Sequence, residues 1–139
     1  FPALVLGIFW RRANKWGAVV GMLAGLAHPQ LRKAIVAMHE QPEKEWSLEQ
    51  LGAVSGMSRS HFANGFRDVV GVTPGSYLQR WRVGLAQKAL LAGKSLKHIA
   101  QDVGYGSEAA LSRAFKAQSG RSPREWRNEV NGERADVSA

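Results

Sequence analysis

Four histidines are the side chains in this sequence best suited to acid–base or metal chemistry, and they are scattered (His28, His39, His61 and His98). No two of them have the spacing of a metal-binding motif such as HExxH. The absence of cysteine excludes thiolate ligands and disulfide bonds. Ser60 directly precedes His61, but neighbouring residues on a helix point apart and cannot form a nucleophile–base pair. We therefore expect no catalytic residue, no metal site and no cofactor.

Basic side chains are the second chemical feature of the chain. It carries 19 Lys and Arg against 11 Asp and Glu, a formal net charge of +8. Residues 28–127 hold 15 of the basic and 8 of the acidic residues, whereas the segment after Arg127 sums to −2. An excess of this kind favours a polyanionic partner. A basic surface that is simply solvated explains the charge equally well, so charge alone leaves both interpretations open.

The sequence nearly repeats itself. Residues 55–74 read SGMSRSHFANGFRDVVGVTP, and residues 103–123 read VGYGSEAALSRAFKAQSGRSP. The second copy has one extra residue in its turn, so the offset is 48 residues before the turn and 49 after it. The matching pairs are Gly56 and Gly104, Ser58 and Ser107, Phe62 and Leu111, Phe66 and Phe115, Gly71 and Gly120, Pro74 and Pro123, and Tyr77 and Trp126. Agreement in glycines, prolines and apolar spacing indicates a duplicated structural unit.

Helices are the elements that must position these residues. Residues 28–127 contain no period-two run and no hairpin signal, so we expect an all-α fold. A first helix is predicted over about residues 29–41, and Ser47 with Gln50 forms a capping box for the next. Later helices are predicted to begin at Ser58, Thr73-Pro74, Ser95, Ser107 and Ser122-Pro123. The long helix after Thr73 ends at Gly93, and we expect its inward face to consist of Leu78, Trp81, Leu85 and Ala89.

Each copy of the repeat is a short helix, a tight turn containing glycine, and a second helix. This is the helix-turn-helix pattern, in which the second helix lies in the DNA major groove and the first braces it. One such pattern is a weak signal, but two at a fixed separation on a basic chain are far more specific. The bridging helix, about 19 residues long, spans about 28 Å. That length could place two recognition helices about one duplex turn, roughly 34 Å, apart on the same side of DNA.

Residues 28–127 resemble the DNA-binding domain of the AraC/XylS family of bacterial transcription regulators. The resemblance is carried by SLEQLGAVSGMSRSHFANGFRDVVGVTPGSYLQRWRVGLAQKALL and SLKHIAQDVGYGSEAALSRAFKAQSGRSPREWR. It implies seven helices in two helix-turn-helix subdomains joined by a long central helix. It also implies that the chain binds double-stranded DNA upstream of promoters, alters recruitment of RNA polymerase, and acts in the cytoplasm.

The outward side of each second helix should contact DNA. In the first unit, burial of Phe62 and Phe66 leaves the following residues to face the groove: Arg59, Ser60, Ala63, Asn64 and Arg67. By the resemblance, Ser60, Ala63 and Asn64 occupy base-contacting positions, while the two arginines are better placed for phosphates. In the second unit, burial of Leu111 and Phe115 leaves Glu108, Ala109, Ala110, Ser112, Arg113 and Lys116.

Among these residues Arg113 is the strongest candidate, because arginine can bind guanine O6 and N7 with two hydrogen bonds. The alternative for Arg113 is a surface salt bridge with Glu108, or a solvated charge. Glu108 could accept from cytosine N4 or simply complement the helix dipole. Gly65 and Ala63 leave the first unit with few side chains that can contact bases. We therefore expect the second unit to supply most of the sequence specificity.

Residues 1–27, FPALVLGIFWRRANKWGAVVGMLAGLA, differ from everything that follows. Two apolar runs of 10 and 12 residues flank a basic loop, and neither run reaches the roughly 20 apolar residues that span a bilayer. LVLGIFWRRANKWGAVVGMLAGL resembles part of a sodium:solute symporter of the acetate permease-like branch. We expect an apolar leader, either a transporter fragment or a helix packed on the domain, and only this segment could contact a membrane.

The remaining predictions concern the end of the chain and what it lacks. Residues 128–139, NEVNGERADVSA, are polar and aperiodic, which predicts a flexible tail after a final helical turn carrying Trp126. No small-molecule effector domain is evident in the sequence. Two alternatives to sequence-specific regulation stay open: a non-specific basic nucleic-acid binder, and a membrane transporter remnant fused to a passenger domain.

Overall fold

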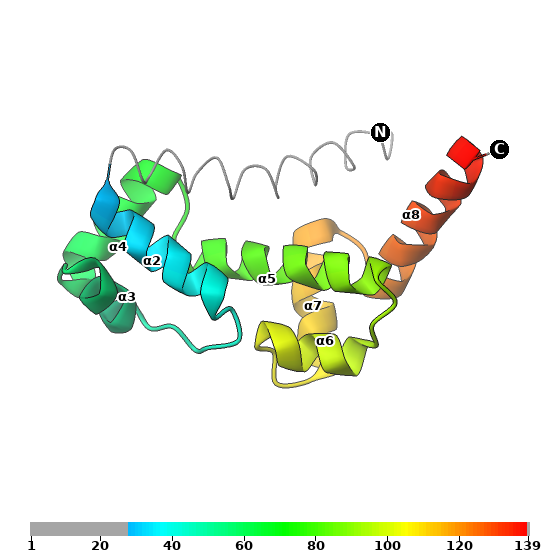
Figure 1. The fold of residues 1–139 in the computed structure, drawn as a ribbon, viewed down its shortest axis with the longest axis horizontal. Coiled ribbons are helices and arrows are strands. Elements are labelled where there is room, and N and C mark those ends of the chain that lie inside the picture. Colours follow the sequence, from blue (N-terminus) through cyan, green and yellow to red (C-terminus); the bar gives the residue numbers. More distant parts are fainter. Residues whose placement is uncertain (1–27, 139) are drawn as a thin grey trace.

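The computed structural model describes residues 28–138, and within that range it contains seven α-helices and no strand (Figure 1). The helices are α2 (Pro29–Glu40), α3 (Leu48–Ser55), α4 (Arg59–Val70), α5 (Pro74–Leu91), α6 (Leu96–Val103), α7 (Glu108–Ser119) and α8 (Pro123–Ser138). The expected all-α fold is confirmed for these residues. The expected apolar leader and symporter resemblance of residues 1–27 lie outside the described residues.

Side-chain caps start the helices where the sequence predicted them. The Ser47 hydroxyl accepts from the Gln50 N–H at 3.1 Å, and the Gln50 side chain accepts from the Ser47 N–H at 3.2 Å, which completes the capping box. Single caps of the same kind begin α4 to α8, from Ser58, Thr73, Ser95, Ser107 and Ser122, whereas α2 begins at Pro29 without a side-chain cap. Each of these oxygens pairs one of the N–H groups that a helix start leaves free.

Two separate apolar clusters form the core, one at each end of α5. The first cluster joins α2, α3 and α4 to the start of α5, through Leu31, Ala34, Ile35, Met38, Leu51, Phe62, Phe66, Val70, Tyr77 and Leu78. The second cluster joins the rest of α5 to α6 and α7, through Val83, Ala86, Leu90, Ile99, Ala100, Val103, Leu111 and Phe115. Figure 1 shows the matching arrangement, with α2–α4 at one end of α5 and α6–α8 at the other.

The buried face of α5 differs from the predicted one. Leu78 is buried as expected, but Trp81, Leu85 and Ala89 are only half-buried, and the other buried apolar residues are Tyr77, Val83, Ala86 and Leu90. At 3.6 residues per turn, Tyr77 lies on nearly the opposite side of α5 from Ala86 and Leu90, and Leu78 lies between them. The helix therefore presents one side to the first cluster and the other side to the second, and no single apolar stripe describes it.

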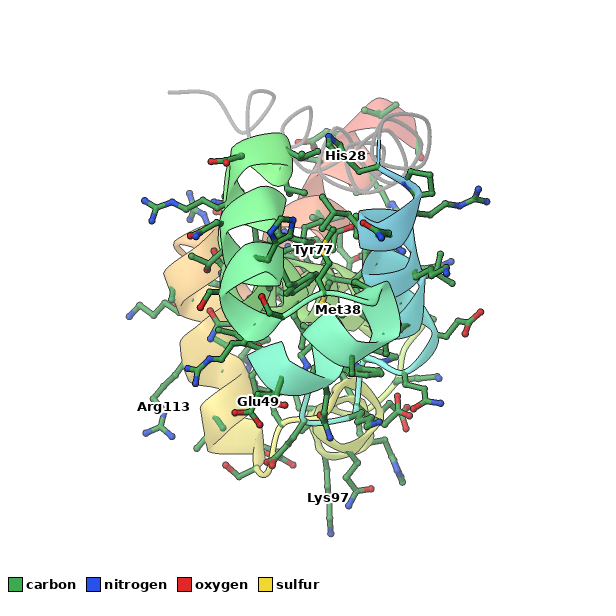
Figure 2. All side chains as sticks on the ribbon, turned by 90° about the vertical axis from the view of Figure 1, so that its left-hand side faces the viewer. His28, Met38, Glu49, Tyr77, Lys97 and Arg113 are labelled. Atoms are coloured by element: carbon green, nitrogen blue, oxygen red, sulfur yellow. The ribbon has the colours of Figure 1, made fainter. Side chains whose placement is uncertain are left out.

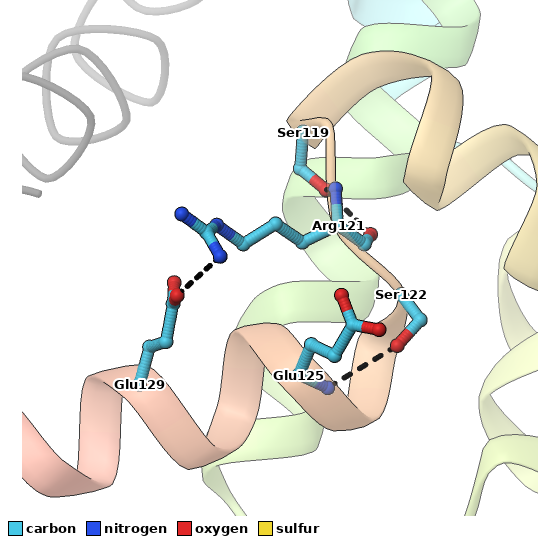
Figure 3. Close-up of polar contacts among 5 residues, drawn as sticks. All are labelled: Ser119, Arg121, Ser122, Glu125 and Glu129. Carbon is cyan, nitrogen blue, oxygen red and sulfur yellow. Dashed lines mark hydrogen bonds and ion pairs between the residues drawn. The ribbon is translucent and has the colours of Figure 1, made fainter. Parts of the chain in front are cut away.

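The segment after Arg127 is also different from the prediction, because α8 continues to Ser138 instead of ending in a flexible tail. Beyond Pro123 and the half-buried Trp126 the helix is largely exposed, so packing contributes little to its length. Local interactions act instead: Arg121 pairs with Glu129 (Figure 3). Ser138 Oγ also donates to the Arg134 carbonyl at 2.9 Å. Residues with adequate helix propensity can extend a helix without an apolar period, so apolar periodicity gave no sign of this extension.

Across residues 28–138, no helix is both long enough and apolar enough to traverse a bilayer.

Candidate nucleic-acid interface

Two helix-turn-helix units of nearly the same geometry are present. In the first unit, α3 ends at Gly56 with φ of 69°, and the Met57 N–H donates to the Gly52 carbonyl at 2.8 Å. In the second, α6 ends at Gly104 with φ of 92°, and the Tyr105 N–H donates to the Ala100 carbonyl, also at 2.8 Å. These left-handed glycines turn the chain between the two helices of each unit.

The duplication extends into the helix that follows each unit. Tyr77 near the start of α5 packs edge-on against Phe66 of α4, with ring centroids 5.7 Å apart and planes at 73°. Trp126 near the start of α8 packs in the same way against Phe115 of α7, at 5.6 Å and 70°. Each unit is thus braced by an edge-to-face aromatic pair at the same place, which orients its second helix on its cluster.

The residues predicted to contact DNA from the first unit lie on the outward side of α4. Phe62 and Phe66 are fully buried, as predicted, and fix which side of the helix faces the first cluster. Arg59, Ser60, Asn64 and Arg67 are exposed, and Ala63 is half-buried. The helix thus presents two arginines, a hydroxyl and an amide to solvent.

The predicted residues of the second unit lie on the outward side of α7 in the same manner. Leu111 and Phe115 are fully buried, while Ala110 and Ser112 are half-buried. The exposed members of the set are Glu108, Ala109, Arg113 and Lys116. Figure 2 shows Arg113 projecting away from the molecule, in contrast to Met38 and Tyr77, which lie inside it. The structure therefore leaves the Arg113 guanidinium free to bind a partner.

Most of the basic side chains on the outward sides of α4 and α7 form no ion pair with an acidic residue among residues 28–138. Arg59 lies 4.0 Å from Glu49, but both side chains are well exposed, so solvent weakens the pair. Within residues 28–138, the other ion pairs are Lys94 with Asp102 and Arg121 with Glu129. The alternative of a Glu108–Arg113 salt bridge is therefore not formed.

The end of α7 is held by a compact polar junction. Ser119 Oγ donates to the Phe115 carbonyl at 2.7 Å and also lies 3.0 Å from the Arg121 carbonyl (Figure 3). Arg121 turns toward α8 to pair with Glu129, so its charge is not part of the outward face of α7. The sequence pattern gave no sign of this orientation, because the position follows the glycine that ends the helix.

No cluster of three or more histidine, cysteine or carboxylate groups able to hold a metal ion occurs among residues 28–138. His61 lies on α4 and is exposed, and His39 lies on α2, where its ring stacks on Trp81 with centroids 3.7 Å apart. The side chains predicted to contact DNA lie on α4 and α7, and most of them are exposed. Two helix-turn-helix units on one central helix, each with an exposed polar second helix, define a helix-turn-helix protein of the DNA-binding type.

Comparison with known proteins agrees with this class. Residues 51–129 match the helix-turn-helix domain family. A putative AraC-like transcription regulator from Streptomyces lividans is 44% identical over 111 residues, which are 79% of this chain and 36% of that protein. The transcriptional regulator AlkR of Acinetobacter baylyi is 44% identical over 108 residues, covering 77% of this chain and 35% of its own length.

A solved structure of similar fold is the DNA-binding domain of AdpA in complex with a target DNA. Its TM-score is 0.69 at 31% identity, and the match covers 76% of this chain and 96% of that chain. The chain belongs to the AraC-type helix-turn-helix family of transcription regulators, a family of DNA-binding domains rather than of enzymes. It spans about a third of the length of the curated relatives it matches first.

Proposed function

We propose that this protein binds double-stranded DNA sequence-specifically and regulates transcription, with α4 and α7 as the two recognition helices. The observation that carries the proposal is the exposed polar face of each second helix, held outward by fully buried aromatic or aliphatic residues on its other side. A major groove admits one α-helix, and side chains on its outward face can then contact base edges. The AdpA structure, in complex with its target DNA, supports the same use of this fold.

The two recognition helices have different roles in this proposal. On α7, Arg113 binds a guanine edge, Glu108 accepts from a cytosine amino group, and Lys116 binds phosphate, with Ser112 as a further polar group on the same helix. On α4, Ser60 and Asn64 contact bases while Arg59 and Arg67 bind phosphates. The small residues contribute shape: Ala63, Ala109 and Ala110. Because α4 carries Ala63 and Gly65 where larger side chains would reach further, α7 supplies most of the specificity.

Regulation would follow from where the protein binds. A chain bound upstream of a promoter can alter recruitment of RNA polymerase, as the family resemblance implies. The contact with polymerase and the cytoplasmic location are predictions.

A selection experiment tests the proposal. The full chain is mixed with a pool of randomised DNA duplexes at near-physiological salt, and the bound fraction is sequenced. We expect an asymmetric motif with two enriched blocks about one helical turn, roughly 10 base pairs, apart. A single enriched block would restrict base recognition to one unit. Binding without any enrichment would overturn sequence-specific recognition in favour of a basic, non-specific nucleic-acid binder.

A further inference from the structure

The loop between α2 and α3 connects the two halves of the molecule. This loop, residues 41–47, belongs to the first half, yet it passes the middle of α5 and reaches the turn of the second helix-turn-helix unit (Figure 1). Arg82 of α5 donates from Nε to the Pro42 carbonyl at 2.7 Å and from Nη2 to the Lys44 carbonyl at 2.9 Å. One guanidinium therefore binds two loop carbonyls that are two residues apart, with charge-assisted hydrogen bonds.

The same guanidinium also faces the second half. Its centre lies 5.6 Å from the centroid of the Tyr105 ring, and Tyr105 belongs to the turn between α6 and α7. A guanidinium at that distance from a ring is attracted to the aromatic face. Arg82 therefore contacts both the 41–47 loop of the first half and the turn that precedes α7.

Backbone packing reinforces this connection. A Cβ added to Gly104 would lie 2.8 Å from both Cα and the carbonyl oxygen of Glu43, so the loop and the turn are in direct contact. The matched glycine of the first unit, Gly56, has nothing within 4 Å of such a Cβ. Of the two matched glycines, only Gly104 is thus approached closely, and the backbone that approaches it is that of the 41–47 loop.

The loop is in turn attached to the first half. Trp46 Nε1 donates to the Gln41 carbonyl at 2.9 Å, the Lys44 ammonium lies 4.2 Å from the Trp46 ring centroid, and Trp46 packs on the first cluster. The loop is therefore attached to the first cluster, to which α3 and α4 contribute. Without the loop contacts, α5 would be the main link between the two units, and the rotation of one about the other would be less restricted.

We propose that Arg82, with the Glu43–Gly104 contact, is a positioning residue that fixes α7 relative to α4 and so limits the spacing between the two DNA blocks that one molecule can bind. The spacing part rests on the proposed function, whereas the positioning part does not. A protein whose two binding heads are held rigidly gains affinity only when the two blocks have the matching separation. If the two units can move relative to each other, this gain in affinity is smaller, and the protein also binds pairs of blocks at other separations.

Distance measurement without DNA tests the positioning part. The chain has no cysteine, so Asp68→Cys on α4 and Ala117→Cys on α7, both at exposed positions, can carry a pair of spin labels. In Arg82→Met, which keeps the stem and removes the hydrogen-bond donors, we expect the distribution of label distances to broaden at unchanged helix content. Arg80→Met is the matched control, because Arg80 is an exposed arginine on the same helix, and its distribution should equal that of the parent.

Binding to duplexes of varied spacing tests the second part. The spacer between the two selected blocks is changed by one, two and five base pairs. For the parent we expect a sharp optimum; for Arg82→Met we expect affinity at the optimum to fall about tenfold, with a smaller difference between spacings and unchanged affinity for one block. If Arg82→Met loses helix content, Arg82→Lys replaces it, since lysine keeps the charge but lacks the planar group that bridges both carbonyls.

Each result decides one part of the proposal. An unchanged distance distribution in Arg82→Met would overturn the positioning role, and an unchanged spacing optimum would overturn the effect on DNA. If the parent selected no sequence at all, the proposed function would fail instead, while the distance measurement would still decide whether Arg82 orients the two units.

Discussion

Asn64 and Arg113 occupy corresponding positions in the two units, since 64 plus the offset of 49 is 113. Both are exposed, and both lie two residues after a fully buried residue, Phe62 or Leu111. The duplicated fold therefore presents an amide from one helix and a guanidinium from the other in the same local setting. An amide pairs best with adenine and a guanidinium with guanine, so one framework can specify two different base pairs.

We expect Arg113→Ala to cost about 1–3 kcal/mol of binding free energy and to relax the preference at one base pair. Asn64→Ala should cost less, because α4 contributes less to specificity. Titration against the selected duplex and its single-base variants measures both effects, with the exposed Arg80→Ala as the control. An equal loss on every duplex would make Arg113 a phosphate contact rather than a base contact.

His39 gives the protein a pH-dependent stability of its own. Its Nε2 lies 2.7 Å from the Tyr77 hydroxyl, and its ring is sandwiched in the aromatic packing beside Trp81. Burial lowers the pKa of His39 to about 4 and raises the pKa of Tyr77 to about 12. Over the usual pH range the imidazole is thus neutral and the phenol protonated, which suits a hydrogen bond donated by the hydroxyl.

Because the pKa of His39 lies below its unfolded value of 6.5, the unfolded chain takes up the proton first as pH falls. The free energy of unfolding should therefore decrease as the pH falls from about 6.5 to about 4. Below pH 4 the protonation of His39 should change it no further. The ring is only half-buried, so solvent screening limits the loss to about 1–2 kcal/mol. Urea unfolding at several pH values measures it, and His39→Phe, which keeps the stacking, should remove this part of the slope. The same slope in both proteins would refute the assignment.

At the scale of single elements, the turns of the two units are less alike than their sequences. The first turn has three residues between its helices and the second has four. A Cβ on Gly52 would lie 2.8 Å from the Met57 carbonyl oxygen, whereas the matching position of the second unit is Ala100. The second turn, which is one residue longer, thus accommodates a methyl group at the position where the first unit has glycine.

The two matched turn glycines should respond differently to replacement by alanine. Gly56→Ala has free space and incurs only the cost of a left-handed backbone, about 1–2 kcal/mol. Gly104→Ala carries the same cost and also pushes a methyl group into the Glu43 backbone, so we expect a larger loss of stability. Thermal or urea unfolding of the two variants side by side measures the difference. Equal losses would show that the loop can move away freely.

Gly65, in the middle of α4, should be replaceable with a gain. Nothing lies within 4 Å of a Cβ built there, and its backbone is helical. Alanine is favoured over glycine in a helix interior by about 1 kcal/mol, so Gly65→Ala should raise the free energy of unfolding by about that amount. Chemical denaturation gives the value directly. A loss of stability instead would mean that α4 depends on the flexibility of this position.

Local sequence patterns predicted the elements well and their partners poorly. Serine caps and left-handed glycines act within a few residues, so the starts of α3 and α4 follow from the sequence alone. The buried side of α5 does not follow from the sequence, because α5 packs against both clusters. A single apolar period cannot describe two buried sides. Arg82 gave no signal either, since its acceptors lie 40 and 38 residues away in the chain. The outward sets on α4 and α7 followed from the apolar spacing alone, while their contact with DNA is a prediction.

At the scale of the whole molecule, both units should contribute to electrostatic binding. With both units on a full-length duplex, log affinity should fall with log salt with a slope of about −5 to −8, close to −0.9 for each phosphate neutralised. A duplex shortened to about one helical turn admits one unit and should give about half that slope. Binding titrations at four salt concentrations measure both values. The same slope on the two duplexes would contradict simultaneous binding by α4 and α7.

The double-sided burial of α5 has no counterpart in α8. As the helix that closes the first unit, α5 offers its reverse side, with Val83 and Ala86, as the wall on which the second unit is built. In α8, the helix that closes the second unit, the corresponding positions are Gly132 and Ala135, and both are exposed. Within residues 28–138, α5 is therefore a wall shared by both units, whereas α8 packs against the second unit alone and leaves its reverse side exposed.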